Sequence, residues 1–317
     1  MKRKVFIVIA SAFVLLVLVL TAASFYFYNV AVARTEKEFL RGNPDLEVSV
    51  SIKEDDPDSD IGAWWEQQAF EDWSLMSDDG LKLHAYYLGA PAQTNKTVII
   101  AHGYSSKAAD MGKLARMYSD KLGYNVLLPD ARGHGNSEGH YIGFGWPERR
   151  DYIQWIDQVI EHSGDQAQIV LHGVSMGGAT VLMTSGEKLP PHVKAVVEDC
   201  GYTSAKEQLA YQLKRMYHLP AFPLVQTTSL VTKLRAGYFF GEASALEQVK
   251  KSVTPTLFIH GDQDLFVPTE MAYKLYENGP AEKKLVIVPG AGHGQARLVN
   301  PEAYDREVSE FIAAYVK

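Results

Sequence analysis

A serine flanked by glycines is the first group in this sequence that could do chemistry. Ser175 lies in the stretch HGVSMGG, residues 172–178, with Gly173 two positions before it and Gly177 two positions after it. The apolar run 168–171 predicts a strand before the serine, and the stretch ATVLM predicts a helix after it. A Gly-x-Ser-x-Gly turn between a strand and a helix is typical of a nucleophile elbow, where larger side chains at the two glycine positions would clash with the neighbouring elements. Ser175 is therefore a candidate nucleophile.

A serine hydroxyl is a poor nucleophile until a base takes its proton. His293 is the candidate base, because it lies between small residues in the late loop PGAGHGQ, 289–295. The stretch HGDQDLFVP, 260–268, offers Asp262 and Asp264 as acids that could orient such a histidine. Serine, acid and histidine follow one another in chain order, each just after an apolar run. This arrangement predicts a Ser-His-Asp triad.

The segments around these residues alternate between strand-like and helix-like patterns. Asp79-Gly80 predicts a hairpin between residues 71–76 and 81–88. Apolar runs that end in glycine or a polar residue predict buried strands at 97–103, 125–130, 168–173, 194–201, 254–261 and 284–290. Helical spacing follows at 109–122, 147–162, 177–188, 269–278 and 301–316. Strands that alternate with helices indicate an α/β protein with a mostly parallel central sheet flanked by helices.

Residues 202–252 interrupt this alternation. The interval is too long for a simple connection, is rich in aromatic and bulky residues, and contains Pro220 and Pro223. We expect it to form a helical cap, inserted before the strand that leads to Asp262 and Asp264, over the carboxyl edge of the sheet where α/β proteins bind ligands. Ordinary packing of a peripheral helix is the alternative explanation, and some of the aromatic residues will serve that purpose.

With these motifs the chain resembles an α/β-hydrolase of the serine esterase/lipase and serine-aminopeptidase-like group, in particular its bacterial membrane-anchored members. The resemblance covers about residues 65–317 and predicts a hydrolase domain over 63–317. It is carried by HGY at 102–104, PDARGHGNSEG at 129–139, GVSMGG, GDQDLFVP and GAGHG. It implies the α/β-hydrolase fold. It also implies that Asp264, three residues before Val267-Pro268, is the triad acid and that Asp262 is a turn residue.

The resemblance implies an oxyanion hole and a substrate pocket as well. One backbone N–H donor is expected from Met176, the residue after the nucleophile. The other is expected from Tyr104, which follows His-Gly. Tyr104, Tyr202 and Phe266 are the residues expected to contact the substrate.

The expected reaction is hydrolysis of a carboxylic ester, with a hydrophobic acyl or aryl group suggested by the aromatic cap. An aminopeptidase or amidase with the same triad is an alternative, and would need an acidic group to bind an amine, for which the cap offers Glu207, Glu242 and Glu247. An acyltransferase and a non-catalytic binding protein are further alternatives. An epoxide or haloalkane hydrolase would carry an acid at position 175.

The N-terminus predicts a membrane anchor. The residues MKRK precede 5–33, a run without a charged residue that is longer than the ~20 residues needed to cross a bilayer. The positive-inside rule then places residues 1–33 as a single-pass anchor and the catalytic domain outside the cytoplasm. Secretion after cleavage near Ala33 is the alternative, because Ala31-Val32-Ala33 resembles a signal-peptidase site. Residues 34–62 are expected to form an acidic, solvated linker.

The overall composition narrows the possible partners. The 317 residues carry a net charge of −7, which argues against nucleic acid as a partner. The single cysteine, Cys200, excludes an internal disulfide and is expected to pack as a small apolar residue. The pattern of His, Asp and Glu residues predicts neither a metal nor a cofactor site. Asp130 and Arg132 are expected to form a structural pair or to support the site.

Overall fold

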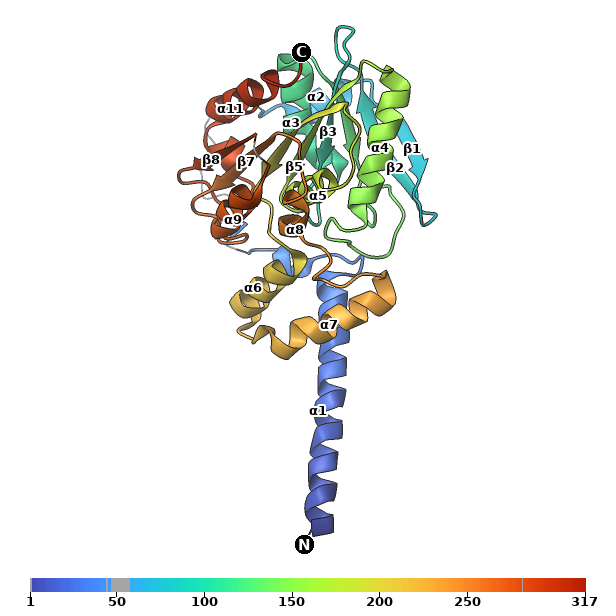
Figure 1. The fold of residues 1–317 in the computed structure, drawn as a ribbon, viewed down its shortest axis with the longest axis vertical. Helices are drawn as coiled ribbons and strands as arrows, with labels where there is room; N and C mark the ends of the chain where they lie inside the picture. The colour runs from blue at the N-terminus through green and yellow to red at the C-terminus, as the bar shows by residue number, and fades with distance from the viewer. Residues whose placement is uncertain (1, 44, 47–57, 281) are drawn as a thin grey trace.

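The computed structural model describes residues 2–43, 45–46, 58–280 and 282–317, and its centre is an eight-stranded sheet (Figure 1). The strand order is β1-β2-β4-β3-β5-β6-β7-β8. The strands are β1 Glu71–Met76, β2 Lys82–Leu88, β3 Lys96–Ala101, β4 Asn125–Pro129, β5 Gln168–Val174, β6 Val193–Asp199, β7 Thr256–Gly261 and β8 Lys283–Val288.

The sheet is antiparallel at one edge and parallel elsewhere. β1 and β2 form the predicted hairpin, and β2 pairs antiparallel with β4, while β3 to β8 are all parallel. Ala101 of β3 lies opposite Gly173 of β5, and Val174 of β5 lies opposite Asp199 of β6. The carboxyl ends of the central strands are therefore in register, and the loops that follow them meet at one edge of the sheet.

Helices cover both faces of the sheet, because alternate residues of its strands are apolar on both sides. In β3, Val98 and Ile100 belong to one core and Ile99 to the other. The first of these cores is completed by α2 Ile61–Gln67, α3 Gly112–Arg116, α10 Ala296–Val299 and α11 Pro301–Ala313. The second is completed by α4 Glu148–Ser163, α5 Met176–Ser185, α8 Ala245–Val249 and α9 Glu270–Asn278.

The predicted helix 109–122 differs from the structure. It is divided into the 3₁₀ segment Ala108–Met111, the helix α3 and a π-turn over Met117–Lys121. The buried side chains still lie on one face of the segment, with Leu114 and Tyr118 in the core. Apolar spacing thus identifies the buried face of this segment, whereas the hydrogen-bond register depends on the packing around it.

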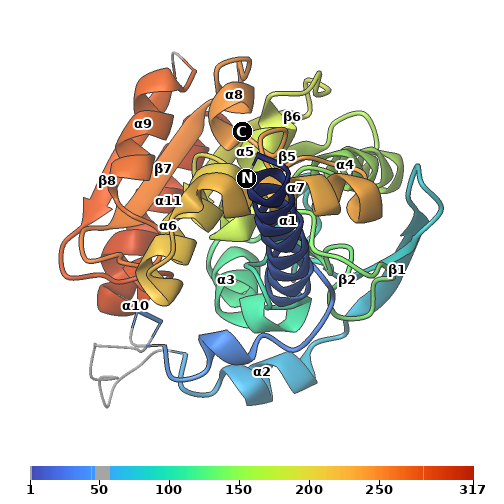
Figure 2. The same cartoon turned by 90° about the horizontal axis from the view of Figure 1, so that it is seen from below.

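The interval between β6 and β7 forms the cap. Its two long helices, α6 Ala205–Tyr217 and α7 Ala221–Ala236, lie beyond the body of the sheet (Figure 1). Seen from below, α6 and α7 lie beside the N-terminal helix, in front of the carboxyl ends of the strands (Figure 2). The cap therefore lies between the sheet and the free end of the N-terminal helix.

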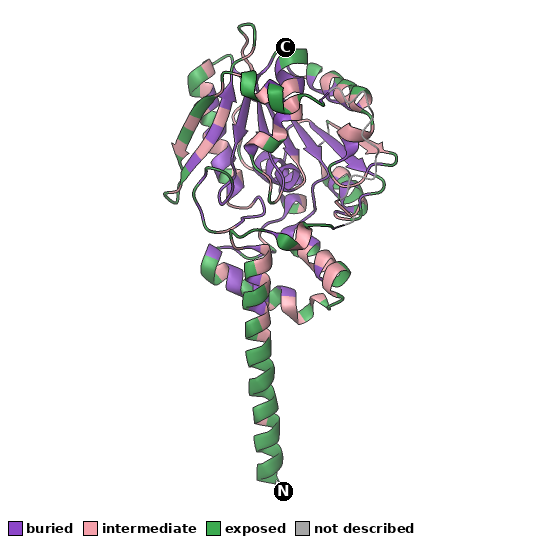
Figure 3. Cartoon of the chain, turned by 180° about the vertical axis from the view of Figure 1, so that it is seen from behind, coloured by how far each residue is buried: buried purple, intermediate pink, exposed green. Residues whose placement is uncertain are grey.

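The N-terminal helix, α1 Lys2–Ala31, has two different parts. Its first two thirds extend away from the rest of the molecule and are mostly exposed (Figure 3). Its last two turns pack against α7 and the sheet domain, where Ser24 and Tyr28 are buried. It is long and apolar enough to cross a membrane, a property that it shares with signal sequences.

Candidate active site

Ser175 occupies a sharp turn between β5 and α5. Its φ of 58° is rare for a residue other than glycine, and its N–H is held by a 2.8 Å hydrogen bond to the Asp199 carbonyl of β6. A Cβ at Gly173 would lie 2.1 Å from the Gly177 carbonyl oxygen, and a Cβ at Gly177 would lie 2.0 Å from the Ala101 carbonyl oxygen. Neither position has room for a side chain, as the sequence pattern predicts.

The other two predicted triad residues reach Ser175 from separate loops. His293 Nε2 lies 2.8 Å from Ser175 Oγ, and His293 Nδ1 lies 2.7 Å from Asp264 Oδ2. Asp264 Oδ1 accepts hydrogen bonds from the backbone N–H groups of Phe266 (2.9 Å) and Val267 (2.8 Å). Asp262 instead accepts a hydrogen bond from the N–H of Gly290, in the turn after β8. The structure therefore brings together Asp264, and not Asp262, with His293 and Ser175.

Asp264 is built to remain ionised although it is only 3% exposed. Burial alone would raise the pKa of its carboxyl group, but the nearby charge of His293 and hydrogen bonds from His260 and His293 outweigh burial and hold the pKa well below its usual range. His260 Nε2 lies 2.9 Å from the Val267 carbonyl and 3.2 Å from Asp264 Oδ2. Since both neighbours are acceptors, His260 donates from this nitrogen. No motif in the sequence predicts this contact of His260 with the acid.

The two predicted oxyanion donors, Met176 and Tyr104, belong to segments that adjoin Ser175. Met176 is the first residue of α5, so its N–H is one of the unpaired donors at a helix N-terminus. The loop before Tyr104 packs against the serine, since a Cβ on Gly103 would lie 3.4 Å from Ser175 Cβ. Within the described part of the chain, neither the Met176 N–H nor the Tyr104 N–H donates a hydrogen bond. Both are available to a substrate oxygen.

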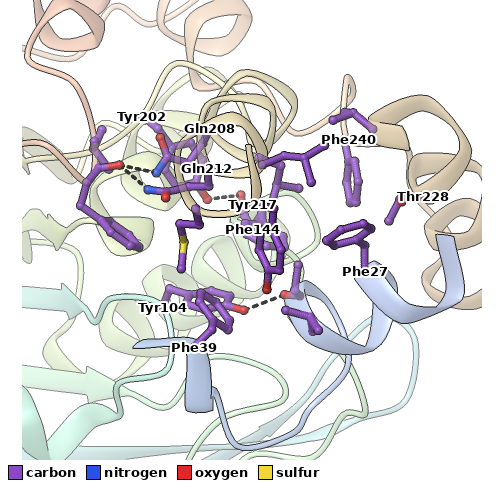
Figure 4. Close-up of a pocket in the computed structure, with 18 of the residues that line it drawn as sticks. Phe27, Phe39, Tyr104, Phe144, Tyr202, Gln208, Gln212, Tyr217, Thr228 and Phe240 are labelled. Atoms are coloured by element: carbon purple, nitrogen blue, oxygen red, sulfur yellow. Dashed lines mark hydrogen bonds between the residues drawn. The ribbon is translucent and has the colours of Figure 1, made fainter. Parts of the chain in front are cut away.

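Ser175 lines a cavity between the sheet and the cap. Figure 4 shows other residues that line this cavity. The cavity encloses about 860 Å³, counting the part that is open to solvent. Its walls are almost entirely aromatic and aliphatic, and the side chains in Figure 4 converge on it from the sheet loops, the cap and α1. The described residues that line it include Tyr104, Phe144, Tyr202, Leu209, Leu213, Met216, Tyr217, Leu224, Val225, Phe240, Phe266 and Val267.

The three predicted substrate contacts all line this cavity. The Tyr104 ring stacks on Phe144, with ring centroids 5.6 Å apart, and the Phe266 ring lies 5.0 Å from the His293 ring. Tyr202 is nearly buried, and its hydroxyl donates to the Phe144 carbonyl at 3.0 Å. The polar ends of Tyr104 and Tyr202 are therefore occupied, and these residues present their rings to the cavity.

One wall of the cavity comes from α1, which sequence analysis treated only as an anchor. Phe27, Val30 and Ala31 line the cavity, and the Ala31 carbonyl accepts a 2.8 Å hydrogen bond from the Tyr104 hydroxyl (Figure 4). The next residue, Val32, is fully buried in the core. No pattern in the sequence signals this contact, because it joins segments more than 70 residues apart.

The start of the predicted linker is likewise part of the domain. The buried Lys37 ammonium donates to the carbonyls of Val30 (2.9 Å) and Ala33 (2.7 Å) at the end of α1, and burial lowers its pKa to about 8. The Arg34 guanidinium donates to the carbonyls of Ser137 and Gly135. Within 34–43 most side chains are exposed, as expected of a linker, but Lys37 and Asn43 are buried and Arg34 and Lys37 bond to the rest of the molecule. Most of the acidic stretch 45–60 lies outside the described residues.

The prediction that Asp130 and Arg132 pair with each other is wrong. Arg132 binds Asp151 (2.6 and 2.7 Å) and Asp79 (2.7 and 3.1 Å), which join the loop to α4 and to the β1–β2 turn. Asp130 instead accepts hydrogen bonds from backbone N–H groups at Ala108 and Asn136. Asp130 and Arg132 are two residues apart in an irregular loop, where the backbone conformation determines which way each side chain points. Sequence spacing alone does not predict their partners.

Cys200 is buried beside the triad. Its sulfur and ligand atoms of Asp264 and His293 lie within 4.8 Å of one another, a spacing that a metal ion could use. Burial raises the pKa of the Cys200 thiol well above its usual value, so it remains protonated and is a poor ligand. Asp264 and His293 are already bonded to each other. The donor set therefore fits a metal poorly.

Comparison with known proteins agrees with this architecture. The family model described as serine aminopeptidase S33 matches residues 92–229, which include Ser175. The Bacillus subtilis protein YqkD is 32% identical over 260 residues, covering 82% of this chain and 85% of YqkD. A thermostable monoacylglycerol lipase of Bacillus sp. strain H-257 is 26% identical over 228 residues, covering 62% and 82% of the two chains.

A solved esterase structure from Pyrococcus furiosus has the same fold. It superposes with a TM-score of 0.65 at 23% identity, covering 82% of this chain and 94% of the esterase. The eight-stranded, mostly parallel sheet with helices on both faces is the architecture that the motifs predict. Together with the hydrolase family model and the extensive match to YqkD, this architecture shows that the chain is a member of the α/β-hydrolase superfamily.

Proposed function

We propose that the protein is a serine hydrolase that cleaves carboxylic esters with hydrophobic acyl or aryl groups. The hydrogen-bonded series from Ser175 through His293 to Asp264 carries the proposal, because it matches the roles of nucleophile, base and orienting acid. The coarser assignment, a hydrolase related to esterases, rests on the family. The assignment of the triad and of the substrate class is what the proposal adds to the family assignment.

In the proposed mechanism, Ser175 Oγ attacks the ester carbonyl while His293 Nε2 takes its proton. Asp264 holds the imidazole in position and stabilises its charged form. The oxyanion that forms accepts hydrogen bonds from the N–H groups of Met176 and Tyr104, with further stabilisation from the N-terminal end of α5. His293 then protonates the leaving alcohol. Water, activated by the same histidine, hydrolyses the acyl-enzyme.

The cavity favours an ester over the amine-bearing substrates of an aminopeptidase. Recognition of a free ammonium group would need a carboxylate near Ser175, and none of the described residues that line the cavity is Asp or Glu. The three acidic candidates of the cap are engaged elsewhere: Glu207 with Thr203, Glu242 with Lys233 and Glu247 with Lys250. An apolar acyl chain fits the lining, and an ammonium group does not.

We also propose that α1 is retained as a membrane anchor. Cleavage near Ala33 would remove the wall formed by Phe27, Val30 and Ala31 and would take the buried Val32 out of the core. The basic residues of Lys2-Arg3-Lys4 support an orientation with the N-terminus in the cytoplasm and the catalytic domain outside it.

Two matched substrate series test the reaction type. The full chain in detergent is assayed on p-nitrophenyl esters from acetate to palmitate and on aminoacyl p-nitroanilides. We expect kcat/KM to rise with acyl length beyond acetate and turnover of the anilides to be at least 100-fold lower. Faster turnover of the anilides would replace the esterase by an aminopeptidase, and transfer of the acyl group to added glycerol in preference to water would replace it by an acyltransferase.

A further inference from the structure

The length of the free part of α1 fixes where a bilayer would lie. Residues Val5–Ala23 carry no charge and are mostly exposed, and at ~1.5 Å per residue they span about 28 Å. The hydrocarbon core of a bilayer is about 30 Å thick. Ser24, the next residue, is 1% exposed and donates a 2.7 Å hydrogen bond to Thr227 of α7. If α1 spans the bilayer, the hydrocarbon core of the bilayer therefore ends near Ser24, where α7 of the cap begins to cover α1.

The cap, which contacts α1 at Ser24, carries exposed apolar side chains. Outside α1, the described part of the chain exposes nine large hydrophobic side chains, and five of them lie on the cap. We call these five the apolar cap face: Leu219, Phe222, Leu230, Leu234 and Phe239. Phe222 is 74% exposed and Leu234 is 79% exposed, and both belong to α7. Large exposed apolar patches are uncommon on soluble monomers and mark interaction sites. Figure 3 shows exposed segments on α6 and α7 beside α1.

The charge of the cap also suits a membrane surface. The segment 205–236 has five Lys or Arg and one Glu, a net charge of +4 in a protein whose total is −7. The Arg235 guanidinium lies 5.0 Å from the ring of Tyr28, and so sits where α7 meets α1. A basic segment interleaved with exposed Leu and Phe side chains is complementary to anionic phospholipid headgroups and the upper part of their acyl chains.

The same three helices form the cavity. The Phe27 ring of α1 contacts the Tyr217 ring of α6 at a centroid distance of 5.2 Å, and both line the cavity together with Leu224 of α7. All three side chains are only half-buried. The helices that would touch the bilayer, α1, α6 and α7, are thus the helices that line the cavity in which Ser175 lies.

We propose that the apolar cap face rests in the membrane surface and that the substrate is an acyl ester taken from that leaflet, a membrane-partitioned lipid rather than a dissolved ester. This inference rests on the proposed function and narrows its substrate class. The occupant of the cap face is the phospholipid bilayer itself. A long acyl chain would pass from the leaflet between α1, α6 and α7 to Ser175 without crossing water.

A fluorescence measurement tests the position of the cap independently of activity. The full chain is reconstituted in nanodiscs of phosphatidylcholine and phosphatidylglycerol. The only native cysteine, Cys200, is buried, so Leu234→Cys can be labelled selectively with an environment-sensitive dye. Val253→Cys is the matched control, because Val253 is 89% exposed and precedes the amino end of β7, away from the cap. We expect spin-labelled lipids to quench the dye at position 234 at least threefold more strongly than at position 253.

A kinetic comparison tests the route of the substrate. Leu230→Ser with Leu234→Ser removes apolar area from the cap face, and Val253→Ser is its control. We expect the double variant to lose roughly tenfold in kcat/KM on a monoacylglycerol of oleic acid embedded in the nanodisc, because membrane contact scales with buried apolar area. Turnover of dissolved p-nitrophenyl butyrate stays unchanged, and the control variant retains both activities.

The outcomes separate this inference from the proposed function. Equal quenching at positions 234 and 253, or equal loss on both substrates, would overturn the membrane position of the cap while leaving the esterase intact. Protection of position 234 in a chemically cross-linked dimer, without lipid quenching, would mean that a second copy of the chain covers the face. Absence of turnover on every ester by folded wild-type protein would contradict the proposed function itself.

Discussion

At the scale of residues, the two aspartates after β7 illustrate how position decides role. Asp264 and Asp262 are two residues apart, yet only Asp264 is buried and bonded to His293. Asp262 is exposed and ties the end of β7 to Gly290. The chemistry of a carboxylate is the same in both places. The backbone N–H groups of Phe266 and Val267, which hold Asp264 toward the histidine, make the difference.

The pair gives a matched test. Asp264→Asn keeps the shape of the side chain but removes the charge that holds His293 in its basic tautomer, so we expect kcat to fall by roughly 10⁴. Asp262→Asn keeps an oxygen that can accept the Gly290 hydrogen bond, and we expect its kcat within about twofold of wild type. The measurement is steady-state hydrolysis of p-nitrophenyl butyrate. A larger loss in the Asp262 variant would exchange the roles of the two residues.

Glu198 gives a prediction of pH-dependent stability. It is fully buried, and burial raises its pKa to about 7 from the ordinary 4.5. Between these values the folded protein holds a proton that the unfolded chain has lost, so the free energy of unfolding falls as pH rises from 4.5 to 7. Glu198→Gln removes this titration. We expect the stability of the variant relative to wild type to increase by up to about 3 kcal/mol from pH 4.5 to pH 8.

Denaturant unfolding of both proteins at pH 4.5, 6, 7 and 8 measures this difference. Subtracting the variant from wild type cancels the contributions of the other buried carboxyl groups, such as Glu148, whose pKa burial also raises to about 7. A difference that stays constant with pH would show that Glu198 is ionised in the folded protein across the whole range.

At the scale of elements, the elbow between β5 and α5 depends on two missing side chains. Gly177→Ala would place a methyl group 2.0 Å from the backbone carbonyl of Ala101, so β3 and α5 would have to separate. We expect a loss of about 3 kcal/mol or more in stability, together with a marked loss of esterase activity. Gly62→Ala is the control, since a Cβ at Gly62 in α2 meets nothing within 4 Å.

Thermal unfolding and ester turnover of these two variants test the prediction. The control should be at least as stable as wild type, because alanine favours a helix over glycine. A Gly177→Ala variant with wild-type stability and activity would mean that β3 and α5 accommodate the extra methyl group, and that the steric explanation of the elbow is wrong.

The sequence predicts the elements well where local pattern and burial agree. The buried parallel strands are continuous apolar runs. The glycines around Ser175 are required by contacts within the β5-turn-α5 unit, for Gly173, and with the adjacent strand β3, for Gly177. Features that depend on distant packing could not be predicted in this way. The π-turn at 117–121 and the partners of Arg132 depend on neighbours brought together only by the complete fold. The contact of His260 with Asp264 spans only four residues, but it depends on the backbone path of the irregular loop after β7.

At the scale of the whole molecule, α1 has a free part and a part that packs against the cap and the sheet domain. Composition alone indicates a membrane span, but it does not reveal that the end of the span closes the cavity. The two parts of α1 divide at Ser24. Residues before it are mostly exposed, whereas Phe27, Val30 and Ala31 after it line the cavity and Tyr28 lies in the core. Truncation on either side of this point should therefore have different effects.

We expect removal of residues 2–23 to leave kcat/KM for p-nitrophenyl butyrate within about threefold of wild type. Removal of residues 1–33, with a new initiating methionine, takes away Phe27, Val30 and Ala31 from the cavity and Val32 from the core. We expect it to lower kcat/KM at least tenfold, and the unfolding temperature as well, because buried apolar area is lost. Full activity and stability of the shorter chain would instead favour a secreted form cleaved near Ala33.

The most direct test of the central claim is covalent labelling by a fluorophosphonate probe, which reacts with activated serines. Wild type and Ser175→Ala, both confirmed as folded by circular dichroism, are treated with the probe, and the labelled peptide is identified by mass spectrometry. The account predicts one labelled peptide containing Ser175 in wild type and no labelling of the variant. No labelling of wild type, or labelling that persists in the variant, would contradict the assignment of Ser175 as the nucleophile.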